Sequence, residues 1–128
     1  MKLTFFGGAG TVTGSKILLE FDHKKILIDC GLFQGLKEFR LKNWEKLAID
    51  LNNLDAVFLT HAHLDHSGYL PLLFKNGYNG SIYCTEATKD LTKIILLDSG
   101  KIQEEDANRA NKYSYTKHEK AEPLYNIA

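Results

Sequence analysis

Three histidines and one aspartate lie within six consecutive positions, in the order His61-Ala-His63-Leu-Asp65-His66. Imidazole and carboxylate groups are ligands that suit zinc and related divalent ions. In an extended loop, residues two apart project to the same side, so His61 and His63 could bind one ion together. Asp65 and His66 could then reach a second ion, as in two-metal sites that catalyse hydrolysis. A polar turn with solvated histidines is the competing interpretation, and four such residues in this order favour the metal site.

The elements that must position this metal segment (residues 61–66) are predicted to be mostly strands. The apolar run at residues 56–60 leads directly into the segment and is predicted to be a buried strand. Further strands are predicted over residues 2–6, 16–21, 25–29 and 81–85. The polar stretch between the second and third of these predicts a hairpin turn, whose histidine at position 23 we expect to be solvated.

Helices are predicted between and after these strands. At least a partial amphipathic helix is predicted within residues 36–49, where four apolar residues recur at loosely helical spacing: Leu36, Phe39, Trp44 and Leu47. Ser67 is expected to cap the helix that follows the metal segment, with Pro71 in its first turn and Gly77 at its end.

A longer helix is predicted in the last third of the chain. It would begin at a cap formed by Thr85 or Thr88 and continue into residues 103–112, where it would be solvated because that part lacks an apolar stripe. Residues 117–123 are predicted to form a polar linker.

The glycine-rich segment near the N-terminus matches neither common nucleotide-binding motif. After Gly8 and Gly10, the third glycine falls at Gly14, one position too late for a dinucleotide-binding turn, and a strand follows where a helix would be needed. A phosphate-binding loop requires glycine-lysine before serine or threonine, whereas the order here is Gly14-Ser15-Lys16. These glycines are therefore expected to shape a tight turn.

Composition is that of an ordinary globular chain. Of 128 residues, 44% are hydrophobic and 25% charged, and the formal net charge is zero, so no global field attracts nucleic acid. The apolar runs are too short to span a membrane, and a signal peptide is not expected. Cys30 and Cys84 are far apart, so we expect reduced thiols and a cytoplasmic location, with Cys30 buried and not a ligand.

The metal segment resembles the His-x-His-x-Asp-His motif of the metallo-β-lactamase superfamily. The sequence segments around it resemble the β-CASP branch of this superfamily, whose members are nucleases that process RNA ends or, in some cases, DNA. These segments are Phe6-Gly-Gly-Ala-Gly-Thr-Val-Thr-Gly-Ser15, Leu27-Ile-Asp-Cys-Gly-Leu-Phe-Gln-Gly35, Leu59-Thr-His-Ala-His-Leu-Asp-His-Ser-Gly-Tyr-Leu-Pro71, Asp98-Ser-Gly-Lys-Ile-Gln-Glu-Glu-Asp106 and Pro123-Leu-Tyr125.

The resemblance implies an α/β fold of the αββα sandwich type, of which residues 1–128 would form only the N-terminal portion. The remainder of the fold and the β-CASP cap domain would be absent. It also implies that Asp29 supports the metal motif, although a strand-end aspartate in an ordinary turn is about as probable from the residues alone. Thr60 has a similar supporting position, with weaker grounds.

The resemblance further implies zinc, with two ions in a complete site. His61, His63, Asp65 and His66 supply two ligands for each ion, and a catalytic zinc usually has three. The family's other ligands come from later motifs, and His118 lacks the sequence context expected of them. We therefore expect weak or partial metal binding by this chain alone.

The resemblance favours a zinc-dependent phosphodiesterase acting on RNA, in which Asp65 helps to orient the attacking water. The 128-residue chain alone is expected to be inactive. Two alternatives remain open: a hydrolase of the same fold acting on a thioester, lactone or small phosphodiester, and a partner-dependent, non-catalytic scaffold. We also expect self-association, because a sheet face that lacks its partner sheet would expose apolar strand residues such as Ile17, Leu19, Ile26 and Ile28.

Overall fold

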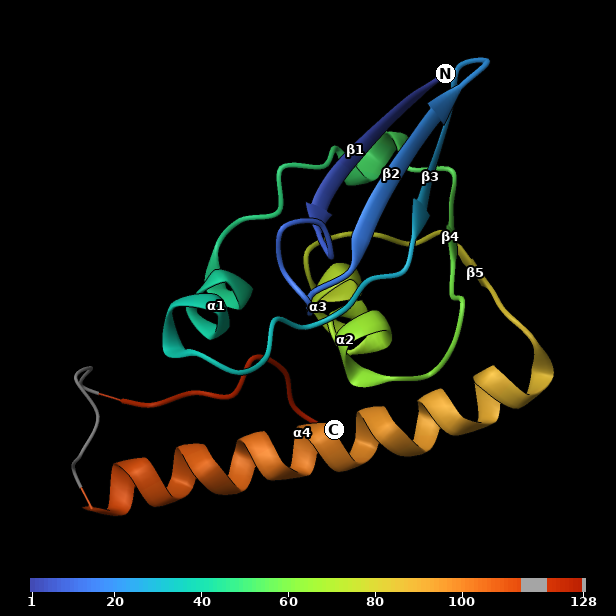
Figure 1. Ribbon diagram of the computed structural model, residues 1–128. Coiled ribbons are helices and arrows are strands. Elements are labelled where there is room, and N and C mark those ends of the chain that lie inside the picture. Colours follow the sequence, from blue (N-terminus) through green and yellow to red (C-terminus); the bar gives the residue numbers. More distant parts are fainter. Residues whose placement is uncertain (114–119, 128) are drawn as a thin grey trace.

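The computed structural model describes residues 1–113 and 120–127, in which five strands form one mixed sheet. The order is β1-β2-β3-β4-β5 (Figure 1). Neighbours among β1, β2 and β3 are antiparallel, whereas β4 is parallel to β3 and β5 is parallel to β4. All five predicted strands are confirmed, with small shifts at their ends: β1 (Lys2–Gly7), β2 (Lys16–Phe21), β3 (Lys24–Ile28), β4 (Ala56–Phe58) and β5 (Ser81–Tyr83).

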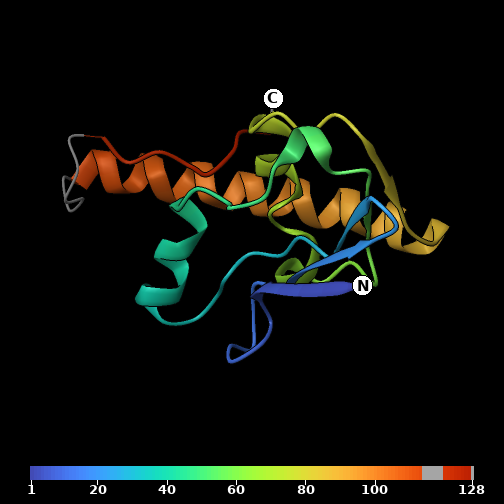
Figure 2. The ribbon, with the colours of Figure 1, turned by 90° about the horizontal axis from the view of Figure 1, so that it is seen from above.

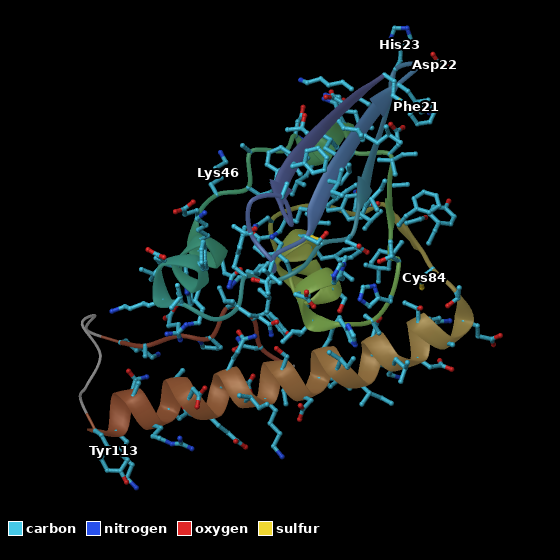
Figure 3. The ribbon with its side chains drawn as sticks, viewed as in Figure 1. Phe21, Asp22, His23, Lys46, Cys84 and Tyr113 are labelled. Atoms are coloured by element: carbon cyan, nitrogen blue, oxygen red, sulfur yellow. The ribbon has the colours of Figure 1, made fainter. Side chains whose placement is uncertain are left out.

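The predicted hairpin joins β2 to β3 through Asp22 and His23. Both residues have positive φ angles, 44° and 62°, as the central pair of a tight turn that matches the twist of the flanking strands. His23 is exposed at the tip of the hairpin, at the opposite end of the molecule from the long helix (Figure 3). It is therefore solvated, as predicted.

The two faces of the sheet differ in burial. On one face Leu18, Leu27 and Val57 are buried against helix α3 (Leu70–Lys75), whose Leu73 is fully buried. The opposite face carries a row of half-buried and exposed apolar side chains across all five strands. We call this the outer face: Leu3, Phe5, Ile17, Leu19, Ile26, Ile28, Phe58 and Tyr83.

The helix predicted within residues 36–49 is short. It comprises α1 (Lys37–Leu41) and one 3-10 turn (Lys42–Trp44). It is not amphipathic in the expected sense: Trp44 is 58% exposed, while Asn43 is buried and exchanges two hydrogen bonds with the backbone of Phe33. A second 3-10 turn, Leu51–Asn53, precedes β4.

The expected cap at Ser67 is wrong. The second half of the metal segment forms a helical turn of its own, α2 (Leu64–Ser67). Ser67 is therefore the last residue of one helix and not the cap of the next. Its hydroxyl donates to the carbonyl oxygens of Ala62 and His63. Helix α3 begins two residues after Gly68. Pro71 lies in its first turn and Gly77 follows its end, both as predicted.

The long helix α4 (Glu86–Tyr113) is confirmed, with Thr85 as its cap, because the Thr85 hydroxyl accepts from the backbone N–H of Thr88. It lies across the end of the molecule at which β3, β4 and β5 finish (Figures 1 and 2). Residues 120–127 return along it, and the Tyr125 hydroxyl donates to the Leu96 carbonyl. Part of the predicted linker at 117–123, and His118 with it, falls outside the described residues.

Within the described parts of the chain, no helix combines the length and apolar character needed to cross a membrane.

Candidate metal centre

The parallel pairing of β3 with β4 brings two polar residues to one edge of the sheet. Asp29 follows β3, and Thr60 lies just beyond β4. The Asp29 backbone N–H donates to the Phe58 carbonyl at 2.8 Å, which extends the ladder to the point where the strands end. The metal segment starts one residue after Thr60, so the fold places Asp29 directly beside it.

The structure gathers the predicted ligands. The His61 ring centroid lies 4.7 Å from that of His63 and 4.1 Å from that of His66. The Nε2 atom of His66 is 3.4 Å from Oδ2 of Asp65. His63 is exposed and the other three are partly exposed, so solvent and solutes can reach all four. His61 thus lies nearer to His66 than to His63, with which it was predicted to pair.

Asp29 and Thr60 hold two of these imidazoles. The Asp29 carboxylate accepts hydrogen bonds from the Thr60 backbone N–H (2.8 Å) and the Thr60 hydroxyl (2.8 Å), and it lies 2.8 Å from Nδ1 of His66. A carboxylate can only accept, so Nδ1 of His66 is the donor. The Thr60 hydroxyl has one proton, which it donates to Asp29. It must therefore accept a hydrogen bond from Nδ1 of His61, 2.9 Å away. Both rings then present Nε2 with a free lone pair.

This donor set fits a divalent metal such as zinc. When Nδ1 of His66 carries the proton, its Nε2 lone pair faces the Asp65 carboxylate, and two electron-rich groups at 3.4 Å favour a cation close to them. Within residues 1–113 and 120–127, however, no group of three or more His, Cys, Asp or Glu side chains is arranged to hold one ion. The ligand roles of His61, His63, Asp65 and His66 therefore remain predictions.

Asp29 itself adopts an unusual backbone conformation. Its φ angle is +59°, in the left-handed region that aspartate tolerates better than most residues other than glycine. Only 3% of its surface is exposed. A residue with this backbone conformation is usually held by its surroundings, here by the hydrogen bonds of its side chain with Thr60 and His66.

The backbone of the metal segment is fixed by main-chain hydrogen bonds. Asp65 O accepts from Ser15 N (2.9 Å), His66 O from Cys30 N (2.7 Å) and Leu64 O from Leu32 N (3.1 Å). Gly31, in the middle of this contact, has no room for a side chain: a Cβ atom there would overlap the Asp65 carbonyl oxygen and lie 2.6 Å from His66 N. The segment 30–32, which we call the support segment, therefore packs directly on the metal segment.

One buried charged residue near the site was not singled out from the sequence. Lys16 is 2% exposed, and burial lowers the pKa of its ammonium from 10.5 to about 8. The strand alternation that places Lys16 on the same face as Leu18 was the available signal. Cys30 is fully buried, and burial raises the pKa of its thiol to about 12, so it is protonated at neutral pH and unsuited to bind metal.

Comparison with known proteins identifies the family. The sequence profile of the Metallo-beta-lactamase superfamily matches residues 10–118. Ribonuclease TTHA0252 of Thermus thermophilus is 48% identical over 105 residues, which cover 82% of this chain and 24% of that protein. Transcription termination factor FttA of Cenarchaeum symbiosum is 42% identical over 106 residues, covering 80% of this chain and 16% of the factor. The chain thus spans about a quarter or less of these relatives.

Among solved structures, human tRNase Z, short form, is similar with a TM-score of 0.48 and 21% identity, covering 98% of this chain and 43% of that one. The sequence relatives are of the β-CASP RNA-processing branch, in agreement with the resemblance found in the motifs. Because the family profile matches most of its length, this chain belongs to the metallo-β-lactamase superfamily.

Proposed function

We propose that this chain is the N-terminal part of a metal-dependent nuclease that cleaves phosphodiester bonds in RNA. The observation that carries the proposal is the hydrogen bonding around Asp29 and Thr60, which leaves the Nε2 lone pair of His61 free and turns that of His66 toward the Asp65 carboxylate. The ribonuclease relative, 48% identical over 82% of this chain, supports RNA as the substrate.

The superfamily fold implies a metal cofactor. We propose zinc, because imidazole and carboxylate are its common ligands, with two ions in a complete site. His61 and His63 would bind one ion, and Asp65 and His66 the other. Two ligands for each ion leave both shells short, so the remaining ligands would come from other parts of a longer protein. The remainder of the sandwich and a cap domain would lie there as well.

When bound, the metal would supply hydroxide near neutral pH and stabilise charge on the phosphate. The residues of this chain would do the rest. Asp65 would help to orient the attacking water through its carboxylate. Asp29 would keep the proton of His66 on Nδ1, and Thr60 would keep that of His61 on Nδ1, so that both rings bind through Nε2.

The charge balance bears on how RNA would be held. The chain has a formal net charge of zero, so RNA would have to be bound by a local patch or by other domains. DNA would meet the same two-metal chemistry, and the choice between them would rest with the cap domain. A cytoplasmic location would agree with the two free cysteines.

We further propose that the chain associates with itself through the outer face. Phe5 is 53% exposed there, Tyr83 52% and Phe58 43%, and the Phe58 and Tyr83 rings stack with centroids 5.0 Å apart. An apolar surface that crosses a whole sheet is unusual on a monomer. Covering it would recover part of the roughly 25 cal/mol per Å² that burial of apolar surface contributes.

Cleavage of single-stranded RNA tests the function. The longer protein should cleave it, and His63→Ala or Asp65→Ala should abolish cleavage, whereas His23→Ala in the hairpin turn should not. The 128-residue chain alone should show only background cleavage. Hydrolysis of thioesters with RNA left intact would establish the alternative hydrolase, and no hydrolysis at all would favour the scaffold.

Calorimetric titration with zinc tests the metal site separately. The chain alone should bind zinc weakly, because too few ligands converge in the described residues. Tight binding of two ions by a monomer would contradict this ligand count and would bring His118 back as a candidate.

A further inference from the structure

Lys16 is the first residue of β2, and its ammonium is buried behind the metal segment. Nζ donates to the Gly31 carbonyl at 2.6 Å and lies 3.5 Å from the Gly14 carbonyl. It also lies 4.7 Å from the ring centroid of Phe33 and 4.6 Å from that of Tyr69. Two carbonyl oxygens and two aromatic faces thus surround one cation. No ion pair to Lys16 is found within the described ranges of the chain.

These contacts join the segments that meet at the metal centre. Gly14 belongs to the glycine-rich turn, and Gly31 is the middle residue of the support segment. Tyr69 follows the metal segment, and its backbone N–H donates to the Cys30 carbonyl at 2.9 Å. The residue next to Lys16, Ser15, donates its own N–H to Asp65 O. Lys16 therefore contacts residues before, beside and after the predicted ligands without contacting any ligand.

Gly31 contacts both the Lys16 ammonium and the main chain of two predicted ligands. Its carbonyl faces Lys16, while its Cα side packs on the Asp65 carbonyl and His66 N without room for even a methyl group. Backbone segments packed this closely cannot shift independently of each other. A displacement of Gly31 O would therefore move the main chain of Asp65 and His66.

We propose that Lys16 is a positioning residue of the metal centre, whose ammonium holds the support segment in the position that aligns Asp65 and His66. This inference rests on the proposed metal site. It gives a reason for keeping a charge in an interior where burial disfavours it, since an apolar side chain of similar length would fill the space but leave the Gly31 carbonyl without a donor.

The test compares Lys16→Met with Lys42→Met in the 128-residue chain. Lys42 is a matched control, because its Nζ lies 5.5 Å from the ring centroid of the same Phe33, but from the exposed side. Amide hydrogen exchange of Ser15 and Cys30, which donate to Asp65 and His66, should accelerate about tenfold or more in Lys16→Met relative to the β2–β3 ladder. Zinc affinity measured by calorimetry should fall by about tenfold, as expected when a support of a metal ligand is lost. Lys42→Met should change neither.

Unchanged exchange at Ser15 and Cys30 in a folded Lys16→Met protein would overturn the proposal. If that variant does not fold, the wild-type protein still decides. The 15N resonance of an ammonium held by Gly31 O should be observable at neutral pH with slowed proton exchange, and a Lys16 signal that exchanges like those of surface lysines would overturn it. If the wild-type chain binds no zinc, the proposed function is in question, while the exchange comparison still tests the positioning role.

Discussion

Oδ2 of Asp29 lies 2.8 Å from Nδ1 of His66, and this contact joins the end of β3 to the predicted ligand farthest along the metal segment. The same carboxylate accepts the backbone N–H of Thr60 through Oδ1. One side chain therefore fixes both the entry to the metal segment and the proton position on an imidazole near its end.

Asp29→Asn should weaken zinc binding about 10- to 100-fold, because an amide offers one acceptor oxygen to the three donors that Asp29 serves, and its NH2 group cannot accept from His66. Calorimetric titration measures the change. Asp55→Asn is a matched control: Asp55 also accepts a backbone N–H, that of Lys25 at 2.8 Å, but at the opposite end of β3. Equal losses of affinity in both variants would contradict a specific role for Asp29.

Gly31→Ala should destabilise the protein by about 3 kcal/mol, because the added methyl group overlaps the backbone of Asp65 and the overlap can be relieved only by moving the metal segment. Gly35→Ala should cost only about 1 kcal/mol, since that site has a positive φ angle but open space around it. Urea unfolding gives both free energies. Similar values for the two variants would mean that the support segment can move freely.

Stability should depend on pH through Lys16. Its pKa in the folded protein, about 8, is below its ordinary value of 10.5, so between these values the unfolded chain binds more protons than the folded one. The free energy of unfolding should therefore rise with pH over this window, by at most about 3 kcal/mol. Lys16→Met should lack the rise.

Cys30 acts in the opposite direction, because its folded pKa of about 12 exceeds the ordinary value of 9.0, so its contribution to stability is lost as pH rises above 9. Urea unfolding between pH 7.5 and pH 10 is therefore best compared in a Cys30→Ala background, with and without Lys16→Met. Parallel pH profiles for the two proteins would contradict the assignment to Lys16.

The chain should form dimers or larger assemblies, and Phe58→Glu should shift them toward monomer, because burying a carboxylate within the outer face costs free energy. Leu91→Glu, at a 55% exposed position on α4, should leave the assembly intact. Light scattering measures the mass. A monodisperse wild-type monomer would show that the outer face is tolerated in water.

The sequence predicted the strands well because their apolar runs are bounded by turn residues, as at Asp22 and His23. It predicted helix positions less well. Ser67 was assigned to a cap because serine commonly begins helices, but the metal segment forms a helical turn of its own, and the Ser67 hydroxyl bonds back to Ala62 O. In the same way, Trp44 was expected to help form an apolar stripe, and the structure leaves it exposed.

The grouping of the four predicted ligands could be read from their spacing, since six consecutive positions cannot lie far apart. Their surroundings could not. The contact between Gly31 and Asp65 joins residues 34 positions apart, and Lys16 reaches the same place from a third part of the chain. Such contacts depend on how the strands align, which local patterns in the sequence do not specify.

The frame of the metal segment is made of main-chain atoms: Asp65 O, His66 O and Leu64 O accept from the amides of Ser15, Cys30 and Leu32. Every amino acid carries a main-chain carbonyl, so these three bonds do not depend on which side chains the segment displays. Substitutions at positions 61, 63, 65 and 66 can thus exchange one ligand set for another without redrawing the path of the chain. The groups that fix the shape of this segment are thus distinct from the side chains that would bind the metal.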